Sequence, residues 1–307
     1  MATCGSFQSV GGQELDTRLW ATDGQPKGII QIVHGMAEHI DRYDEAARAL
    51  NQAGYAVVGH TQAGHGASAA VKGYLADRDG WDVLIQDVHR LRLDTQAQFP
   101  GVPYFLLGHS MGSFVVRTYC LSDEEGLAGV IISGTGHFDK PLLTAGSVIA
   151  AVQGFFGGAK KPCMLLHNMN FSANNKQVEN PQTENDWLSR DLERVKRYCA
   201  DPLCGFPFTA KGYGDMFTGL KRLYPDKLTA MQKDVPILLF SGDHDPVGHN
   251  GEGVKKVYEE LKAAGVKDVT MKLYKDGRHE MFNELNRDEV VADLIAWLEP
   301  RTGEGGR

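Results

Sequence analysis

Residues 104–112 read Tyr-Phe-Leu-Leu-Gly-His-Ser-Met-Gly, an apolar run that ends in the pattern Gly-x-Ser-x-Gly. This pattern is typical of a buried strand that turns sharply into a helix and leaves a serine hydroxyl exposed at the turn. The serine backbone is strained in such a turn, and side chains at 108 and 112 would clash where strand and helix approach each other. The stretch therefore predicts a strand–turn–helix unit and makes Ser110 a candidate nucleophile.

Strand-like and helix-like segments alternate on both sides of this unit. Short, nearly continuous apolar runs are typical of parallel strands covered on both faces, and they occur at 29–33, 55–58, 104–107, 129–132, 237–240 and 269–274. Apolar residues at spacings of three and four predict helices between them, at 43–50, 81–91, 254–261 and 291–298. The alternation predicts an α/β fold with a mostly parallel central sheet and helices on both faces.

The alternation fails between two of the predicted strands, from about residue 136 to 223. This stretch holds apolar helical patches, a polar segment and a charged helix-like piece. We interpret residues 136–223 as an inserted, mainly helical cap over the sheet edge, and residues 1–135 and 224–300 as the core. A separately folded domain is the alternative interpretation. The Gly-rich end of the chain, 301–307, is expected to be disordered.

Composition and charge exclude several classes of protein. The 307 residues are 42% hydrophobic, which is enough for a large buried core, and the net charge of -7 offers no electrostatic basis for binding nucleic acid. Five widely spaced cysteines without a Cys-x-x-Cys pair predict reduced thiols and no structural zinc. The first residues lack the pattern of a signal peptide, and no apolar window reaches the length of a membrane span. We therefore expect a cytoplasmic protein, and the sequence makes no prediction of its oligomeric state.

A serine hydroxyl is a poor nucleophile at neutral pH, because it needs an imidazole to take its proton and a carboxylate to hold that imidazole. Candidates for the carboxylate and the imidazole follow later predicted strands. Asp243 and Asp245 come after one strand, and His279 comes after the next. Of eleven histidines, His279 is the one that follows a strand beyond the aspartates. Asp245 lies further from its strand end and has more room to bend toward His279, whereas Asp243 is also suited to capping a turn.

The negative oxygen of a tetrahedral intermediate needs two backbone donors. We assign one to the amide of Met111, at the start of the helix that follows Ser110. The other should come from a loop after an early strand, and we assign it to the amide of Met36 because a His-Gly pair directly precedes it. His34 is expected to brace this loop rather than to catalyse. Glu38 and His39 either hydrogen-bond near the loop or are solvated.

No motif for a cofactor or a metal accompanies these residues. The segment 64–68, Gly-His-Gly-Ala-Ser, is Gly-rich, but it lacks the G-x-G-x-x-G spacing of a phosphate-binding loop and predicts a tight turn. The chain has no His-Glu-x-x-His pattern. We therefore expect neither a catalytic metal nor a cofactor.

Taken together, the motifs resemble the monoglyceride lipase and lysophospholipase branch of the serine α/β-hydrolases, which is similar to the S33 serine aminopeptidases. The resemblance spans about 28–298 and is carried by five segments, at 34–43 (HGMAEHIDRY), 64–68 (GHGAS), 108–112 (GHSMG), 277–284 (GRHEMFNE) and, in the cap, 188–190 with 201–203 (LSR and DPL). The chain departs from the family before residue 64, where the family usually has Asp and often Arg. Thr61 and Ala63 stand there instead, which puts the hydrogen bonds of that loop in question.

The resemblance implies an α/β-hydrolase fold in which Ser110, Asp245 and His279 form the catalytic triad. The family places its acid three residues after a glycine, which favours Asp245 over Asp243. It implies a serine carboxylic ester hydrolase that acts on a small-molecule mono-acyl ester, such as a monoacylglycerol or a lysophospholipid, through an acyl-serine intermediate. It also implies that the cap contacts membranes transiently to collect lipid.

Three alternatives remain open beside this hypothesis. The same triad would serve an amidase or aminopeptidase, which needs an acidic site near the cleft, or a short-chain carboxylesterase. A binding protein with a hydrolase fold and no catalysis is the third. The apolar residues within 142–156 line an acyl tunnel, pack the cap onto the core, or do both.

Overall fold

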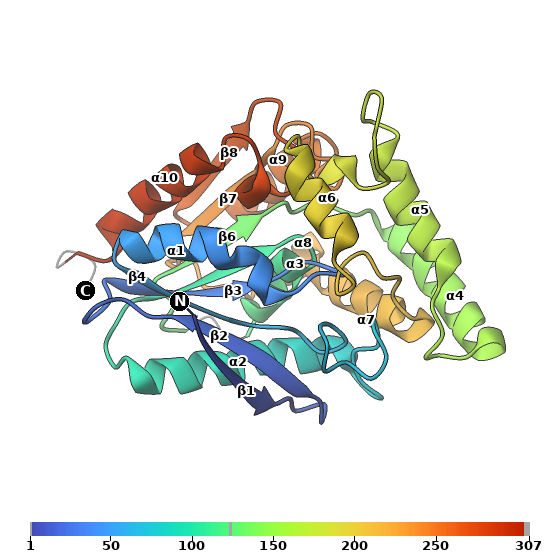
Figure 1. Cartoon of the computed structure of the whole chain (residues 1–307), viewed down its shortest axis with the longest axis horizontal. Helices are drawn as coiled ribbons and strands as arrows, with labels where there is room; N and C mark the ends of the chain where they lie inside the picture. The colour runs from blue at the N-terminus through green and yellow to red at the C-terminus, as the bar shows by residue number, and fades with distance from the viewer. Residues whose placement is uncertain (1, 123–124, 304–307) are drawn as a thin grey trace.

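One sheet runs through the molecule, with helices on both of its faces (Figure 1). The computed structural model describes residues 2–122 and 125–303. Within this described part, eight strands pair in the order β1-β2-β4-β3-β5-β6-β7-β8. They are β1 (Thr3–Gln8), β2 (Glu14–Trp20), β3 (Gly28–Val33), β4 (Tyr55–His60), β5 (Tyr104–His109), β6 (Gly129–Ser133), β7 (Ile237–Gly242) and β8 (Val269–Tyr274). β3 to β8 pair parallel, whereas β2 pairs antiparallel with both β1 and β4.

The core helices confirm the four segments that apolar spacing predicts. They are α1 (Asp44–Gln52), α2 (Gly80–Gln98), α9 (Glu252–Ala263) and α10 (Arg287–Leu298). A fifth helix, α3 (Met111–Tyr119), begins directly after Ser110, as the Gly-x-Ser-x-Gly pattern predicts. α1 and α10 cover one face of the sheet, and α2 lies across the other (Figure 1).

Alternate side chains of the buried strands feed two separate apolar clusters, because successive residues of a strand point to opposite faces. Ile30 and Ile32 of β3 pack with Leu50 of α1 and Leu294 of α10. Val33 belongs to the cluster of the other face, which α2, α3 and α9 complete. Full burial of one such aliphatic side chain stabilises the fold by roughly 1.5–3 kcal/mol, so the two clusters hold the strand ends, and the loops that follow them, in place.

The N-terminal hairpin of β1 and β2 has no counterpart in the predicted strands. Most side chains of β1 are exposed, and charged residues interrupt β2. An antiparallel edge of this kind needs apolar residues only where it meets the core, as Leu15 does in one cluster and Trp20 in the other. The continuous apolar runs that reveal parallel strands are therefore missing here.

Five helices lie between the neighbouring strands β6 and β7. They are α4 (Lys140–Gly157), α5 (Met164–Asn175), α6 (Leu192–Ala200), α7 (Ala210–Leu220) and α8 (Pro225–Leu228). α4, α5 and α7 gather beyond one end of the sheet (Figure 1). α7 packs along α4 and also contacts α2 and α3 of the core, so these helices rest on the sheet layer. The cap boundaries at 136 and 223 stay a prediction.

The structure describes the start of the C-terminal tail, residues 301–303. Arg301, at the start of the tail expected to be disordered, lies in the short helical turn η5 (Glu299–Arg301) and pairs with Asp268 at 2.5 Å. Residues 304–307 of that tail lie outside the described residues. Across the described ranges, no helix combines the length and the apolar character needed to cross a membrane.

Candidate active site

Ser110 stands at a sharp turn between β5 and α3. Its φ of 51° and ψ of -121° put a non-glycine residue at positive φ, a strained conformation. Its amide donates to the Ser133 carbonyl at 2.9 Å, which ties the turn to β6. The flanking glycines are required: a Cβ on Gly108 would lie 2.4 Å from the Gly112 carbonyl oxygen, and one on Gly112 would lie 2.0 Å from that of Val33.

The structure brings Asp245, and not Asp243, to His279. Nδ1 of His279 lies 3.0 Å from each carboxylate oxygen of Asp245, and the two side chains are 2% and 0% exposed. The carboxylate also accepts hydrogen bonds from the Ser241 hydroxyl at 2.8 Å and the Val247 amide at 2.9 Å. The Asp243 carboxylate instead contacts the imidazole of its neighbour His244.

The charges of this pair stabilise each other. Burial alone would lower the pKa of His279, but the charge and hydrogen bond of Asp245 outweigh burial and raise it. Burial would likewise raise the pKa of Asp245, yet His279, Ser241 and the Val247 amide together hold it below its usual value. Asp245 is thus ionised at neutral pH, and its carboxylate orients Nδ1 of His279. Nε2 is the ring nitrogen that Asp245 does not contact.

The loop after β3, residues 34–39, lies directly against the serine. A Cβ on Gly35 would be 3.2 Å from that of Ser110. The amides on either side of Met36 are both engaged, since that of Gly35 donates to Glu38 at 2.5 Å and that of Ala37 to His65 at 3.2 Å. Within the described residues, neither Met36 nor Met111 donates its amide to a protein acceptor, and both residues line the same cavity as Ser110.

His34 braces this loop through hydrogen bonds of its ring. Its Nε2 accepts from the Gln62 amide at 2.9 Å, which leaves Nδ1 to donate to the Gly35 carbonyl at 2.8 Å. Burial, followed by the nearby His65 ring, lowers the pKa of His34 well below its usual value, so the ring is neutral. The Gln62 side chain also donates to the His34 carbonyl.

Backbone groups of the loop that departs from the family are hydrogen-bonded within the described structure. The Thr61 amide donates to the Asp16 carbonyl of β2 at 2.8 Å, and the Ala63 carbonyl accepts from His65 at 3.1 Å. Gly64 and Gly66, which follow, have φ values of 78° and 72°, as the predicted tight turn requires.

A buried ion triad joins the β3 loop to the loop of His279. Arg42 donates to Glu38 at 2.5 Å and, with both terminal nitrogens, to Glu280 at 2.6 Å. Glu38 is thereby buried and hydrogen-bonded rather than solvated. The Arg42 guanidinium also lies 4.7 Å from the centre of the Tyr198 ring. Sequence reasoning assigns no role to Arg42 or Glu280, although both lie in the segments that resemble the family.

His39 is likewise bonded rather than solvated, since its Nε2 lies 2.9 Å from the Asp201 carboxylate. This pair links the β3 loop to the end of α6. The Gly205 amide, a few residues further on, donates to the Ala37 carbonyl at 2.9 Å. Contacts from the segment that follows α6 therefore also hold the β3 loop in place.

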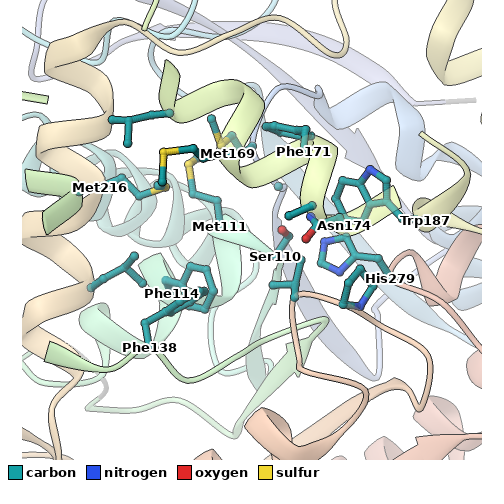
Figure 2. Close-up of a pocket in the computed structure, with 18 of the residues that line it drawn as sticks. Ser110, Met111, Phe114, Phe138, Met169, Phe171, Asn174, Trp187, Met216 and His279 are labelled. Carbon is teal, nitrogen blue, oxygen red and sulfur yellow. The ribbon is translucent and has the colours of Figure 1, made fainter. Parts of the chain in front are cut away.

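A cavity of about 370 Å³ opens beside Ser110. Figure 2 shows Ser110 and His279 facing it together, with Met111, Phe114 and Met216 along its walls. Most of the wall is apolar and comes from α3, α4, α5 and α7, through residues that include Phe114, Leu143, Ile149, Leu166, Met169, Met216 and Phe217. Polar groups gather at the end where Ser110 lies. Such a cavity suits an extended apolar group with one reactive polar end.

This sheet, with a strained serine presented where β5 turns into α3, defines an α/β-hydrolase. Solved structures agree: a highly thermostable carboxyl esterase from Bacillus coagulans, solved in complex with glycerol, matches with a TM-score of 0.92 at 30% identity, over 98% of this chain and 99% of its own. The chain belongs to the serine aminopeptidase S33 family, whose sequence profile matches residues 24–286.

Two named relatives cover nearly the whole chain. The monoacylglycerol lipase of Mycolicibacterium smegmatis is 29% identical over 300 residues, which are 95% of this chain and 95% of the relative. The monoglyceride lipase of Homo sapiens is 29% identical over 301 residues, which are 96% of this chain and 90% of the relative.

Proposed function

We propose that the protein hydrolyses mono-acyl lipid esters, of the monoacylglycerol or lysophospholipid kind. The observation that carries the proposal is the apolar cavity of about 370 Å³ that ends at Ser110. Its walls suit an acyl chain, and in this proposal the ester carbonyl lies at its polar end, beside the serine. The names of the two lipases above and of the Bacillus coagulans esterase support ester hydrolysis.

In the proposed mechanism, the Ser110 hydroxyl attacks the ester carbonyl while Nε2 of His279 takes its proton. Asp245 holds Nδ1 and stabilises the imidazolium that forms. The amides of Met36 and Met111 donate to the oxygen that becomes negative. The C–O bond to the alcohol then breaks, and His279 gives its proton to the leaving alcohol. Water repeats the sequence on the acyl-serine and releases the fatty acid.

An amidase or aminopeptidase has less support from the cavity. A substrate amine needs an uncommitted carboxylate, and the carboxylates on the described cavity wall are Glu38 and Glu280. Arg42 pairs with both. Two of the cap acids are engaged elsewhere: Asp186 accepts from the Gln182 amide, and Asp191 accepts from the amide of Arg194 at the start of α6.

We also propose that α4 and α5 contact a lipid surface from which the substrate enters. Their outer faces expose large apolar side chains, which include Leu142, Val148, Val152, Phe155, Phe156, Leu165 and Met169. Leu142 and Met169 also line the cavity, so the exposed apolar surface continues into the proposed acyl site. Contiguous exposed apolar surface of this kind marks an interaction site.

The experiment is a chain-length series of monoacylglycerols, lysophospholipids, p-nitrophenyl esters and an aminoacyl amide. We expect kcat/KM to rise from short to long acyl esters and the amide to react far more slowly. Ser110→Ala should fold as the wild type does, lose labelling by a fluorophosphonate and lose at least about 10⁴-fold in kcat. Faster turnover of the amide, or a preference for acetyl esters, would overturn the proposed substrate class. Full activity of Ser110→Ala would overturn the mechanism.

A further inference from the structure

The imidazole of His279 has two neighbouring aromatic rings. Its centre lies 5.0 Å from that of the Trp187 indole, with 37° between the planes, and 4.8 Å from that of the His109 ring. Trp187 and His279 lie beside each other at one end of the cavity (Figure 2). All three side chains are buried. Neither the mechanism above nor the sequence motifs give Trp187 a role.

Trp187 comes from the inserted segment, in the helical turn η2 (Asp186–Leu188). This turn is hydrogen-bonded to the loop of His279 through its main chain. The Glu280 amide donates to the Leu188 carbonyl at 2.7 Å, and the Arg278 guanidinium donates to the Asp186 carbonyl at 2.6 Å. Two segments 92 residues apart thus keep a fixed position relative to each other.

Side chains after the turn extend this attachment. The Ser189 hydroxyl donates to the Asn283 carbonyl at 2.9 Å, and Arg190 pairs with the fully buried Glu284 at 2.9 Å. The indole also packs edge-on against Phe171 of α5, with ring centres 5.8 Å apart. The attachment of its turn and these ring contacts keep the indole beside the imidazole.

We propose that Trp187 is a positioning residue for His279, whose indole face stabilises the imidazolium formed during turnover and keeps its ring in line with Asp245. The proposal rests on the proposed function for its effect on rate, and on geometry alone for its effect on the histidine. A cation over the face of an indole is stabilised by the ring quadrupole, more strongly when water is excluded.

The other groups around His279 leave this face to Trp187. Asp245 meets the edge of the ring, and Glu38 and Glu280 contribute their charge from a distance while Arg42 neutralises them. Burial, and then the charge of His279, lower the pKa of His109 to about 4, so that ring carries no charge at neutral pH. The neutral His109 ring therefore adds no charge beside His279, and the indole is the larger of the two aromatic neighbours of a charged His279.

The test compares Trp187→Phe, which keeps an aromatic face, with Trp187→Leu, which keeps apolar cover without one. NMR titration of His279 in Ser110→Ala backgrounds should give a pKa about 0.5–1 pH unit lower with Leu than with Trp, and an intermediate value with Phe. The acid limb of the kcat/KM profile should move by the same amount in the variants that retain Ser110. Trp297→Phe, on α10, is the matched control and should leave the pKa unchanged.

A second measurement needs no folded Leu variant. The difference in emission between the wild type and Trp187→Phe isolates Trp187 among the four tryptophans. An imidazolium quenches indole emission, so this difference in emission should decrease as the pH is lowered and His279 becomes protonated. In a His279→Ala background the difference should show no such step. Equal pKa values in all variants, a higher value with Leu, or a difference signal without the step would each overturn the proposal. A protein that shows these shifts but hydrolyses no mono-acyl ester would overturn only the proposed function.

Discussion

Gly112 shows, at the scale of a single residue, how tightly the turn at Ser110 is packed. An added Cβ would lie 2.0 Å from a backbone oxygen of β3, and backbone at a sheet centre cannot move aside as a side chain can. Gly214 of α7 offers a control, because a Cβ there meets nothing within 4 Å. Comparing the two positions therefore separates the steric clash at Gly112 from the general effect of replacing a helical glycine by alanine.

We predict that Gly112→Ala lowers the free energy of unfolding by at least about 1–3 kcal/mol, because overpacking against atoms that cannot move costs that much. Gly214→Ala should be neutral or raise it by about 0.5–1 kcal/mol, since alanine favours a helix interior. Denaturant unfolding of both variants measures the difference. Equal stabilities would contradict the packing described for the turn.

The two aspartates after β7 give a second prediction at this scale. Asp245→Asn should lower kcat about 10⁴-fold, because the amide no longer stabilises the imidazolium, and should lower the pKa of His279. Asp243→Asn should leave both nearly unchanged, since its carboxylate contacts His244 instead. Rate profiles from pH 5 to 9 measure both effects. Comparable losses in the two variants would rule out the assignment of Asp245.

The raised pKa of His279 also fixes the sign of its pH dependence. Its folded pKa lies above the ordinary value, so its contribution to stability is complete below about pH 6.5 and is lost as the pH rises through the folded value. Activity needs the neutral ring and therefore increases over that same window. We expect stability and rate to change in opposite directions there, apart from the contributions of other groups.

At the scale of elements, the site depends on loops that meet from distant parts of the chain. Arg42, in the helical turn η1 (Ile40–Tyr43) just before α1, joins the β3 loop to the loop after β8 through Glu38 and Glu280. Removal of one partner from a buried ion group leaves uncompensated charge. An exposed pair six residues further along, Arg48 with Asp44, has the same sequence spacing but lies in solvent.

We predict that Arg42→Met destabilises the protein by about 3–5 kcal/mol and lowers kcat, since both loops of the site lose their common partner. Arg48→Met should change stability by less than about 1 kcal/mol. Denaturant unfolding and kcat for one ester measure both variants. The role given to Arg42 fails if it behaves like Arg48.

The sequence predicts those parts of this arrangement that local pattern encodes. The parallel strands show as apolar runs, and the turn at Ser110 shows as two glycines around a serine. The contact of Arg42 with Glu280 joins residues 238 apart, and that of Trp187 with His279 depends on how the inserted segment packs. The hairpin of β1 and β2 is not predicted from the sequence, because a half-exposed sheet edge needs few apolar residues. Tertiary packing, rather than local preference, decides all three.

On the scale of the whole molecule, exposed apolar surface gathers at the end where the cavity lies. Phe155 and Phe156 of α4 are 84% and 83% exposed, so they add little to the stability of the fold. The net charge of -7 opposes attraction to anionic lipid. Apolar burial would then drive contact with a membrane, and vesicles of neutral phosphatidylcholine are the suitable probe.

We predict that Phe155→Ser with Phe156→Ser lowers vesicle binding by at least about 10-fold, because each ring loses roughly 1.5–3 kcal/mol of burial, while turnover of a dissolved short ester stays unchanged. Val10→Ser replaces an exposed apolar residue outside α4 and α5 and should bind as the wild type does. Co-sedimentation measures binding. Undiminished binding of the double variant would exclude α4 as the contact surface.

The inserted helices leave and rejoin the sheet through β6 and β7, which are hydrogen-bonded neighbours. The two ends of the insertion are therefore already close together, and insertions of different length differ little in the entropy of closing that loop. Evolution can exchange this part for another, with a new cavity, without disturbing the register of any strand. If Trp187 positions His279 as proposed, whatever replaces 186–190 must still dock on the loop of His279. One piece of the insertion would then support the histidine, while another shapes the cavity.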